Sequence, residues 1–411
     1  MTEKEFASLI NGVGGHLYIV GGWVRDQIRN EEPKDKDYLV AGIKEAVFCE
    51  LFPEAVKTGK SFPVYRVEVE GKSCETAFAR RERKAGNGYR GFEVAYDDKV
   101  TVEDDLYRRD TTMNSLAIEL PQMRLIDLYG GQADIKAKKI KAISEHFCED
   151  PVRALRAARQ AAEFGFAITD EAYELMERCA NELAAEPPER LLGELRRALR
   201  AARPSIFFRA LDKARLLPAT FPEIAALQDK IQPLAFHPEG DAYEHTLKVV
   251  DEVAAMTENI AARFAGLVHD LGKGTTPIEM LPHHYEHEMR GLEVLKKWNE
   301  RMTLPSDWLK AGLYVIEQHM RAPLMSKPGK IADLLLSIRK SGLPTEDFLA
   351  VIQADHHSLP LYLEKAEELI AVMQRIGGKD APEDLRGPAV GEWIRLQRIQ
   401  LLQSKLKDFR G

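Results

Sequence analysis

The chain has 411 residues, a formal net charge of −7, and a composition that is 45% hydrophobic and 30% charged. This length suits two to four domains of roughly 100–200 residues each, and the composition is typical of a globular protein. The negative charge argues against a protein that binds polyanions over its whole surface, and no apolar run reaches the ~20 residues that a membrane-spanning helix needs. The chain lacks a secretory signal and C-x-x-C spacing of its cysteines, so we expect a cytoplasmic protein with reduced thiols.

After a short helix expected within residues 1–15, an apolar strand at 17–20 leads into Gly21 and Gly22. A helical segment at 23–28 follows directly. Because glycine has no Cβ, the backbone at this pair can approach a phosphate closely, and a helix that begins there would direct free N–H groups toward the phosphate. The segment therefore predicts a phosphate-binding turn.

Two carboxylates, Asp35 and Asp37, open a second apolar strand that ends at residue 41. Residues i and i+2 of a strand face the same side, so the pair would present two carboxylates to one small volume. Two Mg²⁺ ions that bridge a triphosphate need such an arrangement. A lone Gly-Gly is usually a turn and a lone D-x-D is often solvated, but the two in this order are much more specific.

Residues 17–130 alternate strand-like and helix-like segments, which predicts an α+β domain with a mixed sheet. Further strands are expected at 64–69, 74–79, 92–96 and 125–128. From residue 150 onward the apolar spacing is almost wholly helical, and prolines at 217–222 and Pro233 indicate a linker. We predict a multidomain protein with an α+β head at 1–140, a helical neck and body at 141–225, an all-α domain at 226–370 and a helical tail at 371–411.

A basic, glycine-punctuated segment at 78–92 is expected to be a long loop, and loops of this length are often functional. Glu75, on the strand before it, is a less favoured candidate for a further acid beside the metal ions.

The next polar segment, residues 103–117, contains Arg109, Asp110 and Asn114. A guanidinium at Arg109 would neutralise triphosphate charge with paired hydrogen bonds. Asp110 and Asn114 are one helical turn apart, and they would hydrogen-bond a ribose or fix a helix cap. A capped helix with a surface salt bridge is the competing interpretation.

A helix is predicted to begin at Asp150 and Pro151, which suit the N-cap and the first helical position. Arg153, Arg156 and Arg159 then recur every three residues, roughly along one face. Helix initiation explains the Asp-Pro pair but leaves the arginine stripe unexplained.

Residues 190–215 carry eight basic side chains against two acidic ones. Such a run is usually a solvated face, but with a nucleic-acid substrate it becomes the surface that contacts phosphates. We predict that Arg196, Arg197 and Arg200 contact the phosphates of this nucleic acid.

Histidines concentrate between residues 236 and 360, where His269 and Asp270 form an H-D-x-G-K segment and His245 lies on an earlier helix. Imidazole with carboxylate suits Mn²⁺, Ni²⁺, Fe or Zn²⁺. A single buried histidine is usually structural, but this concentration favours a metal site.

Three motifs carry a resemblance. The order strand, Gly-Gly, helix, D-x-D, strand resembles the nucleotidyltransferase core of the DNA polymerase beta superfamily. Within it, G-G-x-V-R-D at 21–26, R-R-D-x-T-x-N at 108–114 and E-D-x-x-R at 149–153 are similar to the class II tRNA nucleotidyltransferases and bacterial poly(A) polymerases, with Ser115 where alanine is usual. The chain after 226 resembles the HD phosphohydrolase superfamily.

The resemblance implies the template-independent addition of C, C and A to the tRNA 3′ end from CTP and ATP. Asp35 and Asp37 would hold two Mg²⁺ ions. Asp150 and Arg153 would pair with the base edge, which is chemically apt because a carboxylate accepts from the amine of C or A and a guanidinium donates. The remaining implied nucleotide-binding residues are Gly21, Gly22, Arg25, Arg109, Asp110, Asn114, Arg156 and Arg159, with the last two facing the triphosphate.

The HD pattern maps onto His245, His269 and Asp270 as ligands of a transition metal such as Ni²⁺ or Mn²⁺, with Asp355 as an uncertain fourth. It implies hydrolysis of a phosphomonoester or a 2′,3′-cyclic phosphate, and His283, His284 and His287 are candidates for further ligands or phosphate contacts.

Alternatives stay open at this point. The chain is a complete CCA-adding enzyme, a CC-adding or A-adding half-enzyme, or an HD phosphohydrolase that binds tRNA ends; a poly(A) polymerase fits less well. The 80–92 loop favours the ability to add A, because the resembled CC-adding enzymes are shortened there, and the loop is implied to switch the enzyme between nucleotides. The sequence does not distinguish a monomer from a homodimer.

Overall fold

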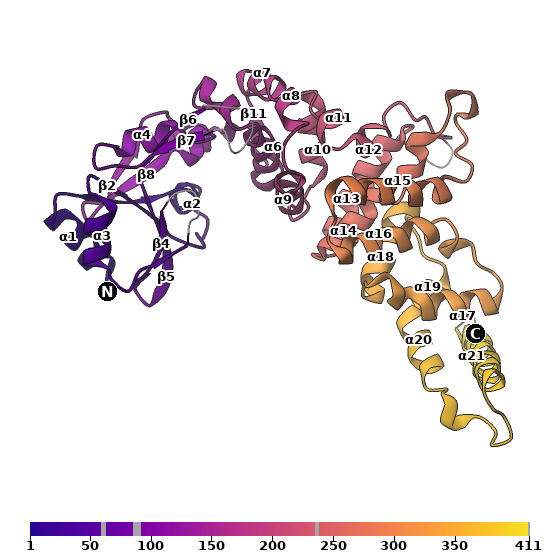
Figure 1. Ribbon diagram of the computed structural model, residues 1–411. Helices are drawn as coiled ribbons and strands as arrows, with labels where there is room; N and C mark the ends of the chain where they lie inside the picture. Colours follow the sequence, from indigo (N-terminus) through magenta and orange to yellow (C-terminus); the bar gives the residue numbers. More distant parts are fainter. Residues whose placement is uncertain (59–62, 85–91, 235–237, 410–411) are drawn as a thin grey trace. The chain divides into compact units, whose positions relative to one another are not determined.

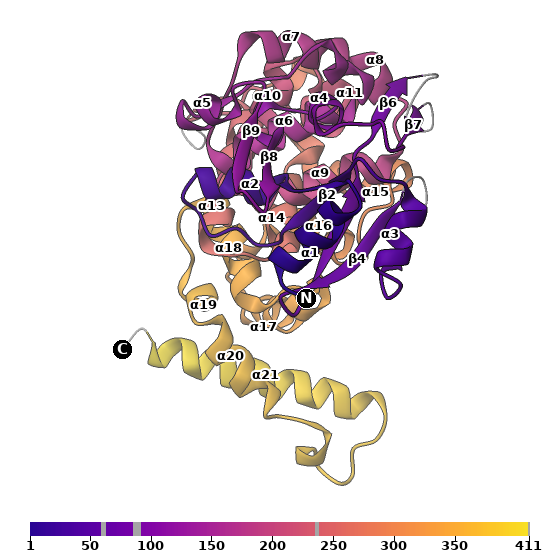
Figure 2. The same cartoon turned by 90° about the vertical axis from the view of Figure 1, so that its left-hand side faces the viewer.

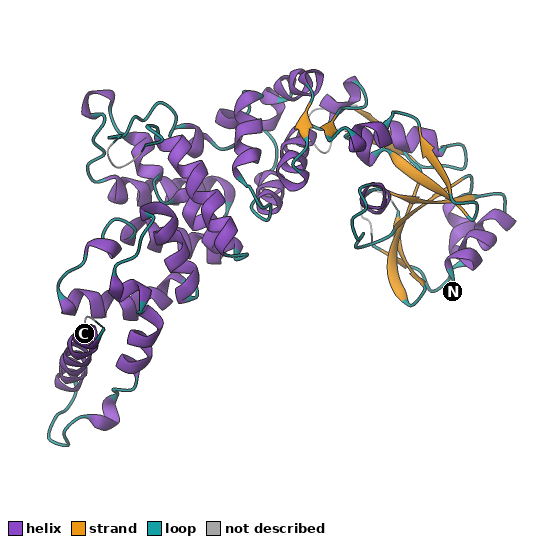
Figure 3. Ribbon diagram, turned by 180° about the vertical axis from the view of Figure 1, so that it is seen from behind, coloured by secondary structure: helices purple, strands orange, loops and turns teal. Residues whose placement is uncertain are grey.

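The structure is a computed structural model that describes residues 1–58, 63–84, 92–234 and 238–409. The chain divides into two compact units. The first unit comprises Met1–Glu194 and Arg209–Thr220, and the second comprises Leu195–Phe208 and Phe221–Gly411. Figure 3 shows the strands within the first unit and helices throughout the second. An α+β head followed by helical domains was predicted, and this fold class is confirmed.

A seven-stranded mixed sheet organises the first unit, with the order β3-β4-β5-β2-β1-β8-β9 (Figure 1). The β2–β5 pair is parallel, and the other neighbours are antiparallel. The strands are β1 (His16–Val20), β2 (Asp37–Ala41), β3 (Val56–Lys57), β4 (Val64–Val69), β5 (Lys72–Phe78), β8 (Leu116–Leu120) and β9 (Arg124–Asp127). Two small sheets pair β6 (Arg81–Lys84) with β7 (Phe92–Ala95) and β10 (Lys139–Ile140) with β11 (Ala167–Ile168).

The helices of the first unit are α1 (Glu3–Gly12), α2 (Gly22–Ile28), α3 (Glu45–Leu51), α4 (Val102–Tyr107), α5 (Gly131–Lys136), α6 (Val152–Phe164), α7 (Asp170–Arg178), α8 (Ala180–Leu183) and α11 (Leu217–Thr220). Two more, α9 (Pro188–Ala198) and α10 (Ser205–Lys213), each have residues in both units.

One face of the sheet is closed by aromatic side chains from α1 and α3. Side chains alternate along β2, so Tyr38 points to this face. Its ring lies 5.4 Å from that of Phe6, and Phe48 lies 5.3 Å from Phe78 in an edge-on contact. Such pairs bury large apolar areas and fix the position of the strand.

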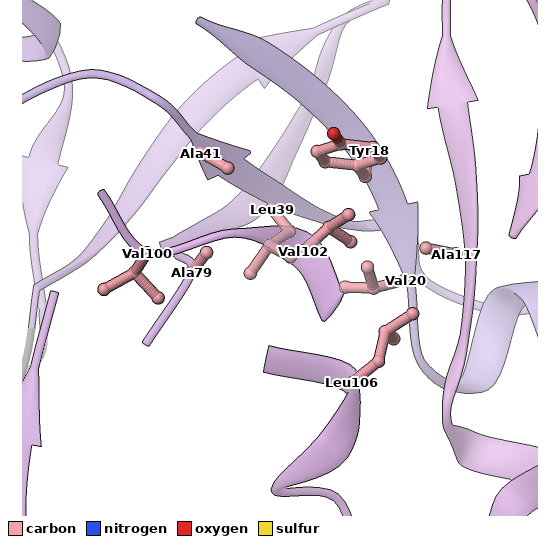
Figure 4. Close-up of a cluster of buried hydrophobic side chains, with 9 residues drawn as sticks. All are labelled: Tyr18, Val20, Leu39, Ala41, Ala79, Val100, Val102, Leu106 and Ala117. Carbon is pink, nitrogen blue, oxygen red and sulfur yellow. The ribbon is translucent and has the colours of Figure 1, made fainter. Parts of the chain in front are cut away.

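The other face of the sheet packs against α4, as Figure 4 shows. Leu39, two residues after Asp37, lies in this cluster, and the side chain of Leu106 lies beside that of Val20. The buried hydroxyl of Ser115 donates to the carbonyl of Leu106 (2.7 Å), which joins the end of α4 to the start of β8. This packing brings the residues after α4 to the end of β1 and the start of β2.

The second unit is a helical assembly in which α13, α14, α16 and α18 pack together (Figure 1), and α21 lies against α20 (Figure 2). Phe264 stacks on Trp308 at 4.9 Å in its core. Its helices are α12 (Pro222–Ala225), α13 (Ala242–Met256), α14 (Ile260–Val268), α15 (His287–Met302), α16 (Ser306–Gln318), α17 (Pro328–Ser337), α18 (Thr345–His356), α19 (Leu361–Glu364), α20 (Ala366–Gln374) and α21 (Pro388–Asp408). Among the described residues, no helix is long and apolar enough to cross a membrane.

Three local expectations need correction. The segment 217–222 is not an exposed linker, because it forms α11 and the start of α12, and Leu217 and Phe221 are fully buried. The sequence analysis missed β8, which follows a 3₁₀ turn at Thr112–Asn114 rather than a helix. Asp35 precedes the strand, which begins at Asp37. The four predicted domain boundaries stay predictions.

Candidate functional site

The glycine turn that was predicted between a strand and a helix is present between β1 and α2. Gly21 has φ +75° and ψ −139°, a conformation that only glycine adopts without strain. A Cβ built there would lie 3.7 Å from Arg109 Nη1 and 3.9 Å from Asp37 Oδ2. Val20 is paired with Asp37 across β1 and β2, so the sheet register itself brings the turn to the carboxylate.

Four carboxylates line one hollow beside this turn, and three of them, Asp35, Asp37 and Glu75, interact electrostatically. Glu75 comes from β5, which runs parallel to β2 with Tyr38 opposite Thr76. Asp37 keeps more than a third of its surface exposed, yet the surrounding protein raises the pKa of its carboxyl to about 6. Partial loss of hydration is the main cause, and Glu75 and Asp35 add to it against the opposing charge of Arg109.

The carboxylate hollow suits Mg²⁺, which prefers oxygen ligands. A divalent ion would offset both the lost hydration and the repulsion that raise the pKa of Asp37. The sequence analysis gave Glu75 little weight, because no spacing rule links a residue on β5 to the D-x-D segment; only the parallel pairing of the strands does.

Arg109 is held at the corner by a buried acid. Its Nη2 donates to Asp105 Oδ2 (2.9 Å) and its Nη1 to the carbonyl of Asn114 (3.1 Å). Arg108 donates to the other oxygen of Asp105 and also to Glu82 (3.0 Å). Burial alone would raise the pKa of Asp105, but the two arginines outweigh it and lower this pKa to about 2. Arg109 is therefore anchored with its charge next to Gly21 and Asp37.

A chain of polar contacts joins Arg25 to α6. Arg25 pairs with Asp26 through two bonds of 2.9 Å, and its Nη1 donates to Asn114 Oδ1 (2.9 Å). Asn114 donates to Asp110 (3.0 Å), which also accepts from Gln160 (3.2 Å). Burial opposes ionisation of Asp110, yet Arg156 and Asn114 keep its pKa below the usual value. The predicted proximity of Asp110 and Asn114 is thus present, although on a 3₁₀ turn.

The start of α6 differs from the expectation in detail. The N-cap is Pro151 rather than Asp150. Asp150 accepts from Val152 N (3.3 Å), and its carboxylate also accepts two bonds from Arg190 (2.8 and 2.9 Å). Arg153 is 4% exposed and donates to the carbonyls of His146 and Arg108. Both side chains are therefore positioned by partners that are distant in sequence.

The other two arginines of α6 share Glu194 on α9. Arg159 Nε lies 2.7 Å from Glu194 Oε2 and Arg156 Nε lies 3.5 Å from Oε1. Arg159 also pairs with Glu163, and its side chain is 12% exposed, whereas that of Arg156 is 38% exposed. Of the stripe, Arg156 is thus the most accessible to a ligand.

The basic run at 190–215 is not one uniform surface. Arg190, Lys213 and Arg215 pair with acids of the first unit, and Arg203 pairs with Asp251 of the second. The predicted contact residues Arg196, Arg197 and Arg200 are all exposed, and all three belong to the second unit.

The HD residues converge in the second unit. His245 Nε2 lies 3.1 Å from Asp355 Oδ1, and His269 Nε2 lies 3.1 Å from Asp270 Oδ2. All four side chains are buried. Burial opposes charge on His269, but Asp270 and Asp355 raise its pKa, and His269 in turn helps to hold the pKa of both aspartates well below the usual range.

This cluster of imidazole and carboxylate donors suits a transition metal. The ligand atoms of His245, His269 and Asp270 lie within 4.8 Å of one another, and a second group with the same property is Asp270, His287 and His319. His319 was not singled out in the sequence, where no motif marks it. His283 is exposed and His284 binds Thr276 and a carbonyl. His237 and residues 85–91 of the expected loop lie outside the described residues.

Three family models match the chain. The Poly A polymerase head domain matches residues 17–141, the probable RNA and SrmB-binding site of polymerase A matches 165–228, and the HD domain matches 242–371. The fold and the two sites thus define a nucleotidyltransferase head followed by an RNA-binding segment and an HD domain.

A multifunctional CCA protein of Acinetobacter baumannii is 37% identical over 404 residues, which cover 94% of this chain and 96% of the relative. The chain belongs to the family of multifunctional CCA proteins. Its fold is similar to the Bacillus stearothermophilus CCA-adding enzyme in complex with CTP (TM-score 0.67, 21% identity, 98% of this chain and 94% of that one). It is also similar to the Thermotoga maritima CCA-adding enzyme complexed with tRNA (TM-score 0.60, 19% identity, 97% and 90%).

The raised pKa of Asp37 predicts a pH effect on stability in the absence of metal. Between about pH 4 and pH 6 the folded chain binds more protons at Asp37 than the unfolded chain, so its contribution to stability falls as the pH rises through this window. Asp37→Asn removes the charge. In the presence of a chelator, the melting temperature of this variant should be higher than that of the wild type at pH 7.5 and equal to it near pH 4.

The control for this comparison is Asp98→Asn, which also removes one carboxylate, from a site where it lies 4.0 Å from Lys44. A difference in melting temperature between Asp37→Asn and wild type that stays constant from pH 4 to pH 7.5 would contradict the raised pKa of Asp37.

Proposed function

We propose that this chain adds C, C and A in turn to the 3′ end of tRNA, with CTP and ATP as substrates and no nucleic-acid template. The observation that carries the proposal is the corner where Gly21, Asp37 and Arg109 meet, with the carboxylates of Asp35 and Glu75 in the same hollow as Asp37. A relative named multifunctional CCA protein is 37% identical over nearly the whole chain, which supports the same reaction.

At this corner the chain's own groups would bind and orient the substrates. Asp35 and Asp37, with Glu75 beside them, would hold two Mg²⁺ ions, and Gly21 and Gly22 would let the backbone approach the triphosphate. When bound, the ions would activate the tRNA 3′-hydroxyl for attack on the α-phosphate and stabilise the leaving pyrophosphate. Arg109 would supply fixed positive charge to the phosphates, because Asp105 already orients its guanidinium.

Selection of C and A over G and U would fall to Asp150 and Arg153. The carboxylate accepts from the exocyclic amine that C and A share, and the guanidinium donates to the ring nitrogen or carbonyl. In this structure Arg190 donates to the carboxylate of Asp150, and Arg153 donates to two backbone carbonyls. Asp150 and Arg153 are thus already oriented and would exchange these partners for the base. Arg25, Asp110, Asn114, Arg156 and Arg159 would bind the rest of the nucleotide.

The HD cluster supports a second activity, a metal-dependent phosphohydrolase. His245, His269, Asp270 and Asp355 would hold a transition ion such as Ni²⁺ or Mn²⁺. When bound, the ion would activate water for attack on a phosphomonoester or a 2′,3′-cyclic phosphate. Damaged tRNA ends would be a suitable substrate, and a tRNA-processing enzyme would act in the cytoplasm.

The first prediction from the proposed function tests the carboxylates. Asp35→Asn and Asp37→Asn should each lower CMP and AMP incorporation by at least about 100-fold, because removal of a metal ligand costs more than removal of a residue that supports one. The measurement is extension of tRNA that lacks its 3′ end, or that ends in C or CC, with CTP, ATP and both.

In the same assay the wild type should make three discrete additions. Arrest after CC, or extension only of tRNA that already ends in CC, would replace the proposal with a half-enzyme. Asp98→Asn is the matched control, and both Asn variants should still hydrolyse phosphomonoesters in Mn²⁺ or Ni²⁺. Near-normal incorporation by Asp37→Asn would exclude its assignment.

The second prediction concerns base selection. Arg153→Lys keeps the positive charge but removes the paired donors, so the ratio of CTP and ATP to UTP and GTP incorporation should fall about tenfold or more, as expected for one bidentate base contact of ~1–3 kcal/mol. Single-turnover kinetics on tRNA that lacks CCA would measure it. An equal loss with all four nucleotides would show a structural role only.

The third prediction concerns tRNA binding. A triple variant in which Arg196, Arg197 and Arg200 are all changed to Gln should bind tRNA more weakly and with less dependence on salt. The slope of log K against log salt concentration should fall by about one for each phosphate that the variant no longer neutralises. The control changes Lys296, Lys310 and Lys340 to Gln, which removes the same positive charge from exposed positions of the same unit. Equal salt slopes for the arginine variant and the wild type would move the tRNA path elsewhere.

A further inference from the structure

Two of the four cysteines of the chain lie together in the first unit. Cys148 belongs to the 3₁₀ turn Glu145–Glu149, and Cys179 follows the last residue of α7. The Sγ atoms of both residues lie 3.3 Å from the same acceptor, the backbone carbonyl oxygen of Leu175. The two sulfurs are therefore near neighbours in space, although they are far apart in the sequence.

The two thiols differ in exposure and in charge. Cys148 is partly buried, whereas Cys179 is only 2% exposed. A hydrogen bond from Cys179, together with the charge of Arg178, lowers the pKa of the Cys148 thiol to about 7, against the opposing effects of burial, Glu145 and Glu182. The same hydrogen bond and burial raise the pKa of Cys179. Near neutral pH, Cys148 is thus the thiolate of the pair and Cys179 keeps its proton.

This arrangement has the features of a redox-active pair of thiols. The thiolate, rather than the thiol, is the form that reacts with an oxidant. Cysteines that respond to oxidation combine a low pKa and access to solvent with a second cysteine close by. Cys148 meets these three conditions, and Cys179 is shielded from solvent but adjacent to Cys148. A pair of inert thiols that only fill space is the competing interpretation.

The other two cysteines have different surroundings. Cys49 is exposed, and its Sγ lies 3.3 Å from the hydroxyl of Tyr65. Cys74 donates to the carbonyl of Lys72 (3.7 Å), and burial raises the pKa of its thiol. These two residues therefore serve as internal references, because one tests exposure alone and the other tests an unactivated thiol.

The position of Cys148 connects it with base selection. The carbonyl of His146 accepts from Arg153, and Asp150 is two residues after Cys148. The turn that carries Cys148 thus lies between the supports of the two side chains proposed to contact the base. In a disulfide the sulfurs are about 2.05 Å apart, which is shorter than the separation of two hydrogen-bonded thiols, so bond formation would displace this turn or the end of α7.

We propose that Cys148 and Cys179 form a reversible oxidation site that responds to hydrogen peroxide. The Cys148 thiolate attacks one peroxide oxygen, the O–O bond breaks, hydroxide departs and Cys148 becomes a sulfenic acid. The sulfur of Cys179 then attacks that of Cys148, so that the S–S bond forms and the S–O bond breaks.

The atoms and electrons of this reaction balance. The first hydroxide takes up the proton that Cys148 released to solvent, and the second takes up the proton of Cys179. One peroxide molecule therefore oxidises two thiols to one disulfide and is itself reduced to two molecules of water. A reducing thiol reverses the change by thiol–disulfide exchange. Disulfides in the cytosol are usually transient bonds of this kind.

Counting thiols and mapping peptides test the proposal. The reduced full chain is treated with a small excess of hydrogen peroxide near pH 7.5, and the remaining thiols are alkylated under denaturing conditions. The protein should lose two of its four free thiols. Trypsin should release residues 142–153 and 179–190 as one linked peptide, which dithiothreitol separates. Four free thiols after treatment, or a link between a different pair, would overturn the proposal.

Single variants of the full chain separate the roles of the two thiols. Cys179→Ser should leave Cys148 as a sulfenic acid that dimedone labels, because no second sulfur is present to react with it. Cys148→Ser should keep Cys179 reduced at the same peroxide concentration, because Cys179 is buried. Circular dichroism and melting verify that each variant folds, and the experiment on the wild type needs no substitution.

The matched control is Cys49→Ser, which removes an exposed thiol and should form the same linked peptide at the same rate. Equal dimedone labelling of Cys49 and Cys148 in the Cys179→Ser variant would show oxidation by exposure alone and would overturn the activated role of Cys148.

The consequence for activity rests on the proposed function. The oxidised wild type should add CMP and AMP to tRNA at least about tenfold more slowly than the reduced protein, because small displacements of groups that orient a substrate are costly. Dithiothreitol should restore the rate, and Cys148→Ser should keep its rate in peroxide. An unchanged rate in fully oxidised protein would reject the effect on base selection. If the reduced wild type incorporates no nucleotide, the proposed function fails, whereas the linked peptide would still establish the oxidation site.

Discussion

A carboxylate that is removed from water must gain positive charge or hydrogen bonds, because an uncompensated buried charge is very costly. Both sites of this chain depend on how that requirement is met. Asp105 is fully buried and satisfied by Arg108 and Arg109, so it serves as an anchor. Asp37 shares a hollow with Asp35, Glu70 and Glu75, and the charge of Arg109 does not offset the lost hydration and the repulsion that raise its pKa. The contrast agrees with the metal role proposed for Asp37.

The same requirement explains the helical unit. Asp270 and Asp355 are buried among histidines, and Lys273 contacts only one oxygen of Asp270. Where the protein supplies a full set of counter-charges, as at Asp105, the group is structural. Around Asp270 and Asp355 it supplies imidazole nitrogens instead, and this set of donors suits a transition metal. Comparison of partners, rather than the presence of acids alone, separates the two roles.

The parts that could be predicted were those with a local cause. Gly21 and Asp37 stand out because strand, turn and helix signals are short-range, and the helical spacing after residue 150 follows from side-chain periodicity. The sequence analysis gave Glu75 little weight and did not single out Arg190 or His319, because their relevance depends on strand pairing or helix packing over long separations. The segment 217–222 was misjudged for the same reason: its prolines indicate a linker, but Phe207, Phe208 and Trp298 surround Phe221 and bury it.

The sequence by itself determined the class of fold, the two motif-bearing sites and the chemistry of their donors, since these depend on residue type and local order. Only the tertiary structure decided which partners each donor has. The parallel pairing of β2 and β5 adds Glu75 to the carboxylate hollow, and the close approach of Gly272 to the carbonyl of His287 sets His287 against Asp270. Charge compensation is a property of groups that meet in space, and residues far apart in the chain meet only after packing fixes the backbone.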